Sequence, residues 1–144
     1  MQYELFVDWR VHRDVLRCSP CVYGKERRDC VLVQSNNGVA VACLLMLLEC
    51  IATGDVPVIQ LALVLYFNPI YRSIGPLERA TNFRRFRQRP RQSAEIVSVE
   101  SIIRGALMVP MMEEAHPVDF LANDLVDDDM YLCFMYYSEK NMFK

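Results

Sequence analysis

The residues best suited to chemistry are five arginines that fall within eight positions of one short stretch, TNFRRFRQRPRQS, which we call the arginine segment (residues 81–93). They are Arg84, Arg85, Arg87, Arg89 and Arg91, and the stretch contains no acidic residue. Pro90 keeps the residue before it out of the helical conformation, so we expect the segment to be extended. Same-face side chains of an extended segment lie roughly 6.6 Å apart. One face then carries Arg85, Arg87, Arg89 and Arg91.

A row of guanidinium groups can follow a phosphate backbone, and Phe83 at its start can offer a stacking plane to a base. Neutralising four phosphates would give a log–log salt slope of about −3 to −4. Two other interpretations stay open. The segment can be an edge strand kept soluble by its charge, or it can pair with the acidic C-terminal third of the chain or with a partner.

The second group with chemical potential is the sequence Cys18-Ser-Pro-Cys21, which supplies half of a tetrahedral zinc site that His12 and Cys30 could complete. No second paired ligand motif exists, and the helix expected here precedes the cysteines, whereas a thioredoxin-like site needs its first cysteine at a helix N-terminus. We therefore expect no metal and no cofactor. Cys43 and Cys50 lie in the apolar run and are expected in the core. Without a signal peptide, the cysteines are expected to be reduced.

Catalytic constellations are not evident. Neighbouring carboxylates in Asp127-Asp128-Asp129 point to alternate sides of an extended chain, so they and Asp124 are expected to form a solvated turn. A serine or cysteine nucleophile needs a base, and nothing in the sequence positions His12 or His116. Neither a P-loop nor a GxGxxG motif is present. The sequence predicts a protein that is not an enzyme.

Composition sets the frame for these residues. A chain of 144 residues, 53% of them hydrophobic, fits one domain with a substantial core. The net charge of −2 gives no overall attraction to nucleic acid, but the arginines cluster in the middle and the acidic residues near the end, which predicts a dipolar field. The apolar runs Val39–Leu48 and Val56–Phe67 are too short for a membrane helix of about 20 residues. We expect an intracellular protein without a membrane partner.

Short strands with turn signals between them must position the arginine segment. Asp8 can cap one short helix over residues 8–17, with Trp9, His12 and Leu16 on one face. Cys30–Gln34 reads as a strand, and Asn36-Asn37-Gly38 as a hairpin turn. Two long strands are then expected: Val39–Ile51, buried on both faces, and Val56–Phe67.

The remainder of the chain continues the pattern. The expected elements are an extended Asn82–Gln88, a strand Ala94–Val99, a turn Glu100–Gly105 leading into Ala106–Val109, a strand Asp119–Val126 and an aromatic segment, residues 130–137. The sequence thus predicts a mostly β fold, a small antiparallel barrel or two packed sheets with one short N-terminal helix, and a β core over about 29–126.

The order of segments resembles a known family. The blocks VDWRVHRDVLRCSPCVYGKERRDCVLVQ, LALVLYF, RFRQRPRQSAEIVSVESIIRGALMVP and LVDDDMYL, over roughly residues 7–135, are similar to a β-rich region toward the C-terminal end of proteins encoded by fungal DNA transposons of the Plavaka kind. Departures at Cys21 and over Asn68–Ala80 suggest a degraded or domesticated copy. The block SVESIIRGALMV is also similar to an element of bromo-adjacent homology barrels, which read chromatin.

The resemblance implies a non-enzymatic interaction module of transposon origin. Together with the arginine segment, the resemblance leads us to expect contact with nucleic acid or chromatin. Contact with chromatin would require the protein to reach the nucleus. The alternatives are a protein-interaction or scaffold domain that docks through a strand edge or through Tyr131–Tyr137, and a degraded copy with no selected function.

Overall fold

The computed structural model describes residues 2–7, 10–36, 38–51, 57–70, 84–111 and 118–123. These residues are mostly β-strand, so the predicted fold class is confirmed. The strands are β1 (Gln2–Val7), β2 (Arg10–Val15), β3 (Cys18–Val22), β4 (Lys25–Arg28), β5 (Cys30–Ser35), β6 (Gly38–Cys50), β7 (Ile59–Pro69), β8 (Arg84–Gln88), β9 (Glu95–Ser98), β10 (Ile102–Ala106), β11 (Met108–Pro110) and β12 (Asp119–Ala122). Two single-turn 3-10 helices, η1 (Arg91–Ser93) and η2 (Val99–Ser101), flank β9.

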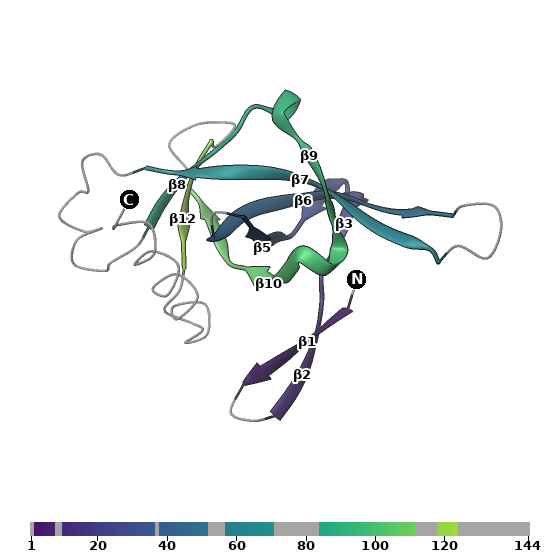
Figure 1. Ribbon diagram of the computed structural model, residues 1–144. Helices are drawn as coiled ribbons and strands as arrows, with labels where there is room; N and C mark the ends of the chain where they lie inside the picture. The colour runs from purple at the N-terminus through teal and green to yellow at the C-terminus, as the bar shows by residue number, and fades with distance from the viewer. Residues whose placement is uncertain are drawn as a thin grey trace.

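Eight strands form one antiparallel sheet in the order β10-β5-β6-β7-β8-β12-β11, with β9 paired to β7 outside this path (Figure 1). The two ends of the path, β10 and β11, are consecutive in the chain and are joined through Leu107. The sheet therefore curls round on itself, but within the described residues hydrogen bonds do not close it into a barrel. Of the two predicted architectures, the closed barrel is not formed by the described residues, which are consistent with packed β-sheets.

The hairpin between β5 and β6 follows directly from the local sequence. Ser35 pairs with Gly38 across the predicted two-residue turn. Gly38 has a φ of 118°, a conformation that side chains with a Cβ rarely adopt and that glycine reaches without steric cost. Because the turn fixes the register, Val31 and Val33 on β5 point to one face and Leu32 to the other.

Strand β7 belongs to two parts of the sheet. Its first half pairs with β9 over Leu61–Val64, and its end, Phe67–Pro69, pairs with β8. It pairs with β6 along most of its length, with an irregularity in β6 between Leu44 and Met46. This change of partner lets one long strand connect both parts of the curled sheet.

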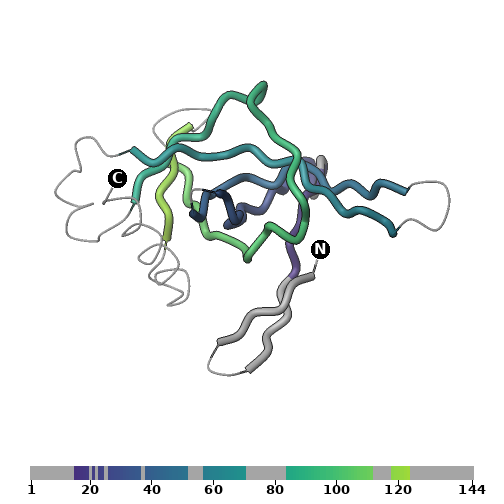
Figure 2. Tube along the Cα trace, in the orientation of Figure 1, coloured from purple at the N-terminus to yellow at the C-terminus, as the bar shows by residue number. Residues whose placement is uncertain are grey.

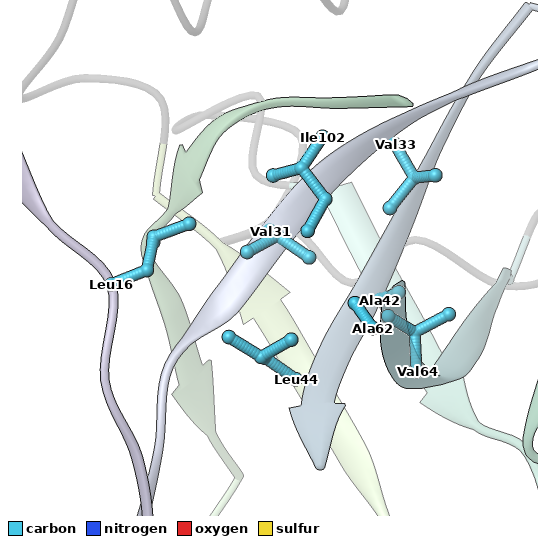
Figure 3. Close-up of a cluster of buried hydrophobic side chains, with 8 residues drawn as sticks. All are labelled: Leu16, Val31, Val33, Ala42, Leu44, Ala62, Val64 and Ile102. Carbon is cyan, nitrogen blue, oxygen red and sulfur yellow. The ribbon is translucent and has the colours of Figure 1, made fainter. Parts of the chain in front are cut away.

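Buried side chains lie on both faces of β5, β6 and β7. Inside the curl, the interior cluster consists of Leu32, Val41, Cys43, Leu65, Phe67, Phe86 and Ala122. On the opposite face, the outer cluster consists of Leu16, Val31, Val33, Ala42, Leu44, Ala62, Val64 and Ile102 (Figure 3). The predicted burial of the central strand on both faces is therefore confirmed for Val41–Leu44. It is wrong for the second half of the strand, where Met46, Cys50 and Ile51 are exposed, because that half extends beyond the two buried clusters.

The predicted helix over residues 8–17 is wrong. Arg10–Val15 forms β2 and pairs in antiparallel register with β1, Gln2–Val7. Valine at positions 11 and 15 favours a strand, and β1 supplies the partner that satisfies the backbone of so short a segment. The spacing of Trp9, His12 and Leu16 is compatible with one face of a helix, but three residues are too weak a signal to outweigh that strand pairing.

Two boundaries also differ from the prediction. The turn expected over Glu100–Gly105 is shorter, because η2 ends at Ser101 and Ile102 already begins β10. The last strand, expected to reach Val126, is described as β12 and ends at Ala122. The aromatic segment 130–137 and the acidic turn 127–129 lie outside the described residues.

Candidate nucleic-acid interface

Residues Arg84–Gln88 of the arginine segment form strand β8, extended as predicted, and the two faces of this strand differ. Phe86 is buried in the interior cluster, while Arg85 and Arg87 lie on the outer face. Phe86 pairs across the sheet with Phe120, and the ring of Phe120 meets Phe67 edge-on at 5.1 Å between centroids. These aromatic contacts anchor β8 and fix which way its arginines point.

Asp119 on β12 binds both outward arginines. It lies directly opposite Arg87 in the register of β8 and β12. Its Oδ1 accepts a hydrogen bond from Arg87 Nε at 2.7 Å, and its Oδ2 accepts from Arg87 Nη2 at 3.0 Å and from Arg85 Nη2 at 2.8 Å. One carboxylate therefore binds two guanidinium groups, and it binds that of Arg87 in bidentate geometry.

The two side chains of the Arg87–Asp119 contact differ in how far they are buried. The side chain of Asp119 is 12% exposed, whereas that of Arg87 is 61% exposed. The hydrogen bonds from Arg87, and then those from Arg85, hold the pKa of the Asp119 carboxyl below its usual range, although burial acts in the opposite direction. Asp119 is therefore ionised at neutral pH, and Arg87 remains accessible beside it.

Arg89 lies beyond the end of β8 and is held separately. Its Nε donates to Asn68 Oδ1 at 2.8 Å, and its Nη1 lies 3.5 Å from Glu95 Oε1. Its guanidinium carbon lies 5.5 Å from the centre of the Tyr66 ring, within reach of a cation–π interaction. Burial, followed by the charge of Glu95, raises the pKa of Tyr66.

The predicted row of four arginines is therefore wrong as a continuous row. Arg85 and Arg87 share a face, but β8 ends at Gln88, Arg89 has its own partners, and Arg91 begins η1. Pro90 is the physical reason, because it has no N–H to continue the strand pairing. Arg84 pairs with Ala122 and shares the face of β8 that carries Phe86. Phe83 lies outside the described residues.

Carboxylates pair with three arginines of the cluster. Around β8 and η1, Arg85 and Arg87 pair with Asp119, and Arg89 pairs with Glu95. Arg91 is exposed. The interpretation that the arginines pair with an acidic residue of the C-terminal third therefore holds for Arg85 and Arg87.

Both cysteines of the Cys18-Ser-Pro-Cys21 motif, for which no metal is expected, lie among the described residues. Cys18 is half-buried, Cys21 is exposed, and both lie on β3. Among the residues that the structure describes, no group of three or more His, Cys, Asp and Glu side chains could hold a metal ion. Likewise, none of the described helices is long and apolar enough to cross a membrane.

A second surface was not recognised in the sequence. The hairpin formed by the far halves of β6 and β7 extends away from the rest of the sheet (Figures 1 and 2). Cross-strand partners share a face of a sheet. One side of β6, β7 and β9 therefore carries a set of uncharged side chains, from the pairs Met46–Leu63, Leu48–Leu61, Cys50–Ile59 and Leu63–Ile96. We call this the apolar arm face. Met46, Ile59 and Ile96 are 49%, 53% and 61% exposed.

The arm face continues the side of the sheet that carries the interior cluster, because Leu65 and Phe67 of that cluster have the same parity on β7 as Ile59 and Leu61. The sequence signal was present in the alternating apolar residues of β7. The sequence could not reveal that the side chains of the arm face are exposed, because their exposure depends on where β8 and β12 end in the folded sheet.

Comparison with models of protein families, with curated proteins and with solved structures finds no match to this chain.

Proposed function

We propose that this chain is a non-enzymatic interaction module that contacts the phosphate backbone of nucleic acid through the arginines of β8 and η1. The observation that carries the proposal is Asp119, which holds Arg85 and Arg87 together while Arg87 stays 61% exposed. Among the described residues, one carboxylate faces two guanidinium groups at that point. Asp119 already occupies the Nε and Nη2 donors of Arg87, so a phosphate would be bound by the outward N–H donors of this exposed guanidinium.

Preorganisation is the second support. An arginine loses up to about 2 kcal/mol of rotamer entropy when it is immobilised. The contacts to Asp119 and, for Arg89, to Asn68 and Glu95 restrict these side chains before any ligand arrives. Less entropy is then lost on binding, so the internal ion pairs are compatible with a binding role.

The resemblance of residues 7–135 to a region of transposon-encoded proteins agrees with this proposal, since such a module would work on DNA or chromatin inside the nucleus. The origin of the chain in a transposon and its intracellular location are parts of the same proposal.

The test is a titration of single- and double-stranded DNA at low salt with the wild-type protein and the double variant Arg87→Ser, Arg91→Ser. Each lost contact is an exposed ion pair of up to about 1 kcal/mol, so affinity is expected to fall roughly three- to thirtyfold. Arg27→Ser is the matched control: Arg27 lies on β4, is 49% exposed and also faces a carboxylate, that of Asp29, at 3.7 Å. An equal loss in the control, or no binding by the wild-type protein, contradicts the proposal.

A second candidate function is self-association through the apolar arm face. Every described side chain on this face is uncharged, so two copies can meet there without bringing like charges together, whereas a strongly charged partner would have to be desolvated. An exposed apolar surface of this kind is typical of interaction sites. The occupant we propose is the same face of a second copy, related by a two-fold axis.

The oligomeric state tests this second function. Light scattering of the wild-type protein is expected to show a dimer, and Ile59→Glu is expected to give a monomer, because the new carboxylate would be buried in the interface. Val109→Glu is the matched control, since Val109 is 44% exposed on β11, away from the arm. A monomeric wild-type protein, or a dimer that survives Ile59→Glu, contradicts self-association through this face.

A further inference from the structure

Two cysteines lie directly opposite one another on neighbouring strands. Cys30 begins β5, and Cys43 lies on β6 in register with it. Both are free thiols. Cys43 is 7% exposed and belongs to the interior cluster, and Cys30 packs against that cluster half-buried. The pair therefore faces the inside of the curled sheet, near the end of β5 that is farther from the hairpin turn.

The hydrogen-bond pattern fixes what kind of pair this is. The backbone N–H of Leu44 donates to the carbonyl of Asp29 at 2.9 Å, so Asp29 and Leu44 are a hydrogen-bonded pair. Because the two kinds of pair alternate along antiparallel strands, Cys30 and Cys43 form a non-hydrogen-bonded pair, in which Cα atoms are about 4.5 Å apart and side chains are closest. A disulfide spans Cα distances of about 4.4–6.8 Å.

The side chains of the two cysteines interact with each other. The thiol of Cys30 is hydrogen-bonded to Cys43, which lowers the pKa of Cys43, and the nearby charge of Arg28 acts in the same direction, against burial, Asp29 and Glu26. The same bond, together with burial, raises the pKa of Cys30. One sulfur of the pair is therefore suited to be the nucleophile, and the other keeps its proton.

We propose that Cys30 and Cys43 are an oxidation site at which hydrogen peroxide forms a reversible disulfide across β5 and β6. The Cys43 thiolate attacks one peroxide oxygen, the O–O bond breaks, and hydroxide leaves, which gives a sulfenic acid on Cys43. The Cys30 sulfur then attacks the Cys43 sulfur and loses its proton, the S–O bond breaks, and water leaves. In total, two thiols are oxidised and one peroxide is reduced to two waters. A thiol reductant reverses the reaction by exchange.

We propose hydrogen peroxide as the oxidant because it is small enough to reach a buried thiol. A larger disulfide such as oxidised glutathione would have to reach Cys43, which is almost completely buried. The other described cysteines lack this arrangement. Cys18 and Cys21 lie three positions apart on β3, and Cys50 lies exposed at the end of β6, where its register partner is Ile59. The inference does not depend on the arginines or on nucleic acid.

The experiment exposes the full chain to a small excess of peroxide, alkylates the remaining thiols after denaturation, and maps the peptides by mass spectrometry. The expected result is a cross-link between Cys30 and Cys43 that lacks the mass of two hydrogen atoms and disappears with dithiothreitol. The double variant Cys18→Ser, Cys21→Ser is the matched control and is expected to form this cross-link at the wild-type rate.

Three outcomes overturn the proposal. The first is full alkylation of Cys30 and Cys43 after peroxide treatment of the folded wild-type protein. This outcome can be observed without any variant. The second is a cross-link that joins either cysteine mainly to a different one. The third is an unchanged rate of loss of the Cys30 thiol in Cys43→Ala, in which Cys30 has no sulfur partner. Circular dichroism checks that this variant is folded.

Discussion

Asp119 is the residue on which the arrangement of the arginines depends. It accepts three hydrogen bonds from two guanidinium groups, yet it lies 34 positions from Arg85 in the sequence. If it is replaced, two arginines on one face of β8 lose the carboxylate between them and repel one another. A residue that could be read as part of an acidic, solvated end of the chain instead organises the basic segment.

We expect Asp119→Asn to lower the free energy of unfolding at neutral pH by about 1–3 kcal/mol, as for the loss of hydrogen bonds between charged groups that are partly buried. The pKa of Asp119 is below its usual value in the folded state. Its contribution is therefore complete above the ordinary aspartate pKa of 3.8 and is lost as the pH falls through the lower, folded-state value. Urea unfolding at neutral and at acidic pH measures both effects.

The control for this prediction is Glu100→Gln, since Glu100 is an exposed carboxylate on η2. Its substitution is expected to change the free energy of unfolding by less than about 0.5 kcal/mol. If the difference between Asp119→Asn and the wild-type protein stays constant as the pH falls below 3.8, ionisation of Asp119 is not the cause.

At the scale of elements, strand β8 joins the core to the candidate interface. Its inner face inserts Phe86 between β7 and β12, and its outer face carries Arg85 and Arg87. The strand is only five residues long, so its position depends on this one aromatic anchor more than on backbone pairing alone.

Phe86→Ala is therefore expected to cost about 3–5 kcal/mol of stability, the range for truncating a buried phenylalanine. Arg91→Ala, at an exposed position of η1 only a few residues along the chain, is expected to change stability by less than about 0.5 kcal/mol. Thermal or urea unfolding of both variants checks the contrast. Equal effects would mean that β8 does not depend on its inner face for its position.

At the scale of the whole molecule, charge is distributed in opposing groups rather than as one basic surface. The net charge is −2, and near β8 and η1 Arg85 and Arg87 pair with Asp119 while Arg89 pairs with Glu95. Long-range attraction to nucleic acid should therefore be weak, and contact should depend on these few groups at short range.

The salt dependence of DNA binding measures how many phosphates these arginines neutralise. For three phosphate contacts, the log–log slope is expected to be about −2 for single strands and about −3 for duplex DNA, shallower than for a row of four arginines. The double variant Arg87→Ser, Arg91→Ser should reduce the slope by about two units in duplex DNA. A slope that is unchanged in the variant would place the phosphate contacts elsewhere on the protein.

The sequence alone determined the local features of this protein. The turn at Asn36-Asn37-Gly38, the apolar strands on either side of it and the extended Arg84–Gln88 all follow from turn chemistry, β-propensity and the effect of Pro90, which act between near neighbours. For the same reason the sequence identified the mostly β fold class and the arginines as the candidate site.

Only the tertiary structure decided which residues meet. Arg10–Val15 became a strand because β1 pairs with it, and Asp119 found Arg85 and Arg87 because β12 lies beside β8. Cys30 meets Cys43 through the register of a hairpin, and the apolar arm face is exposed because β8 and β12 end before it. Each of these depends on contacts between distant positions, whose pairing no local pattern specifies.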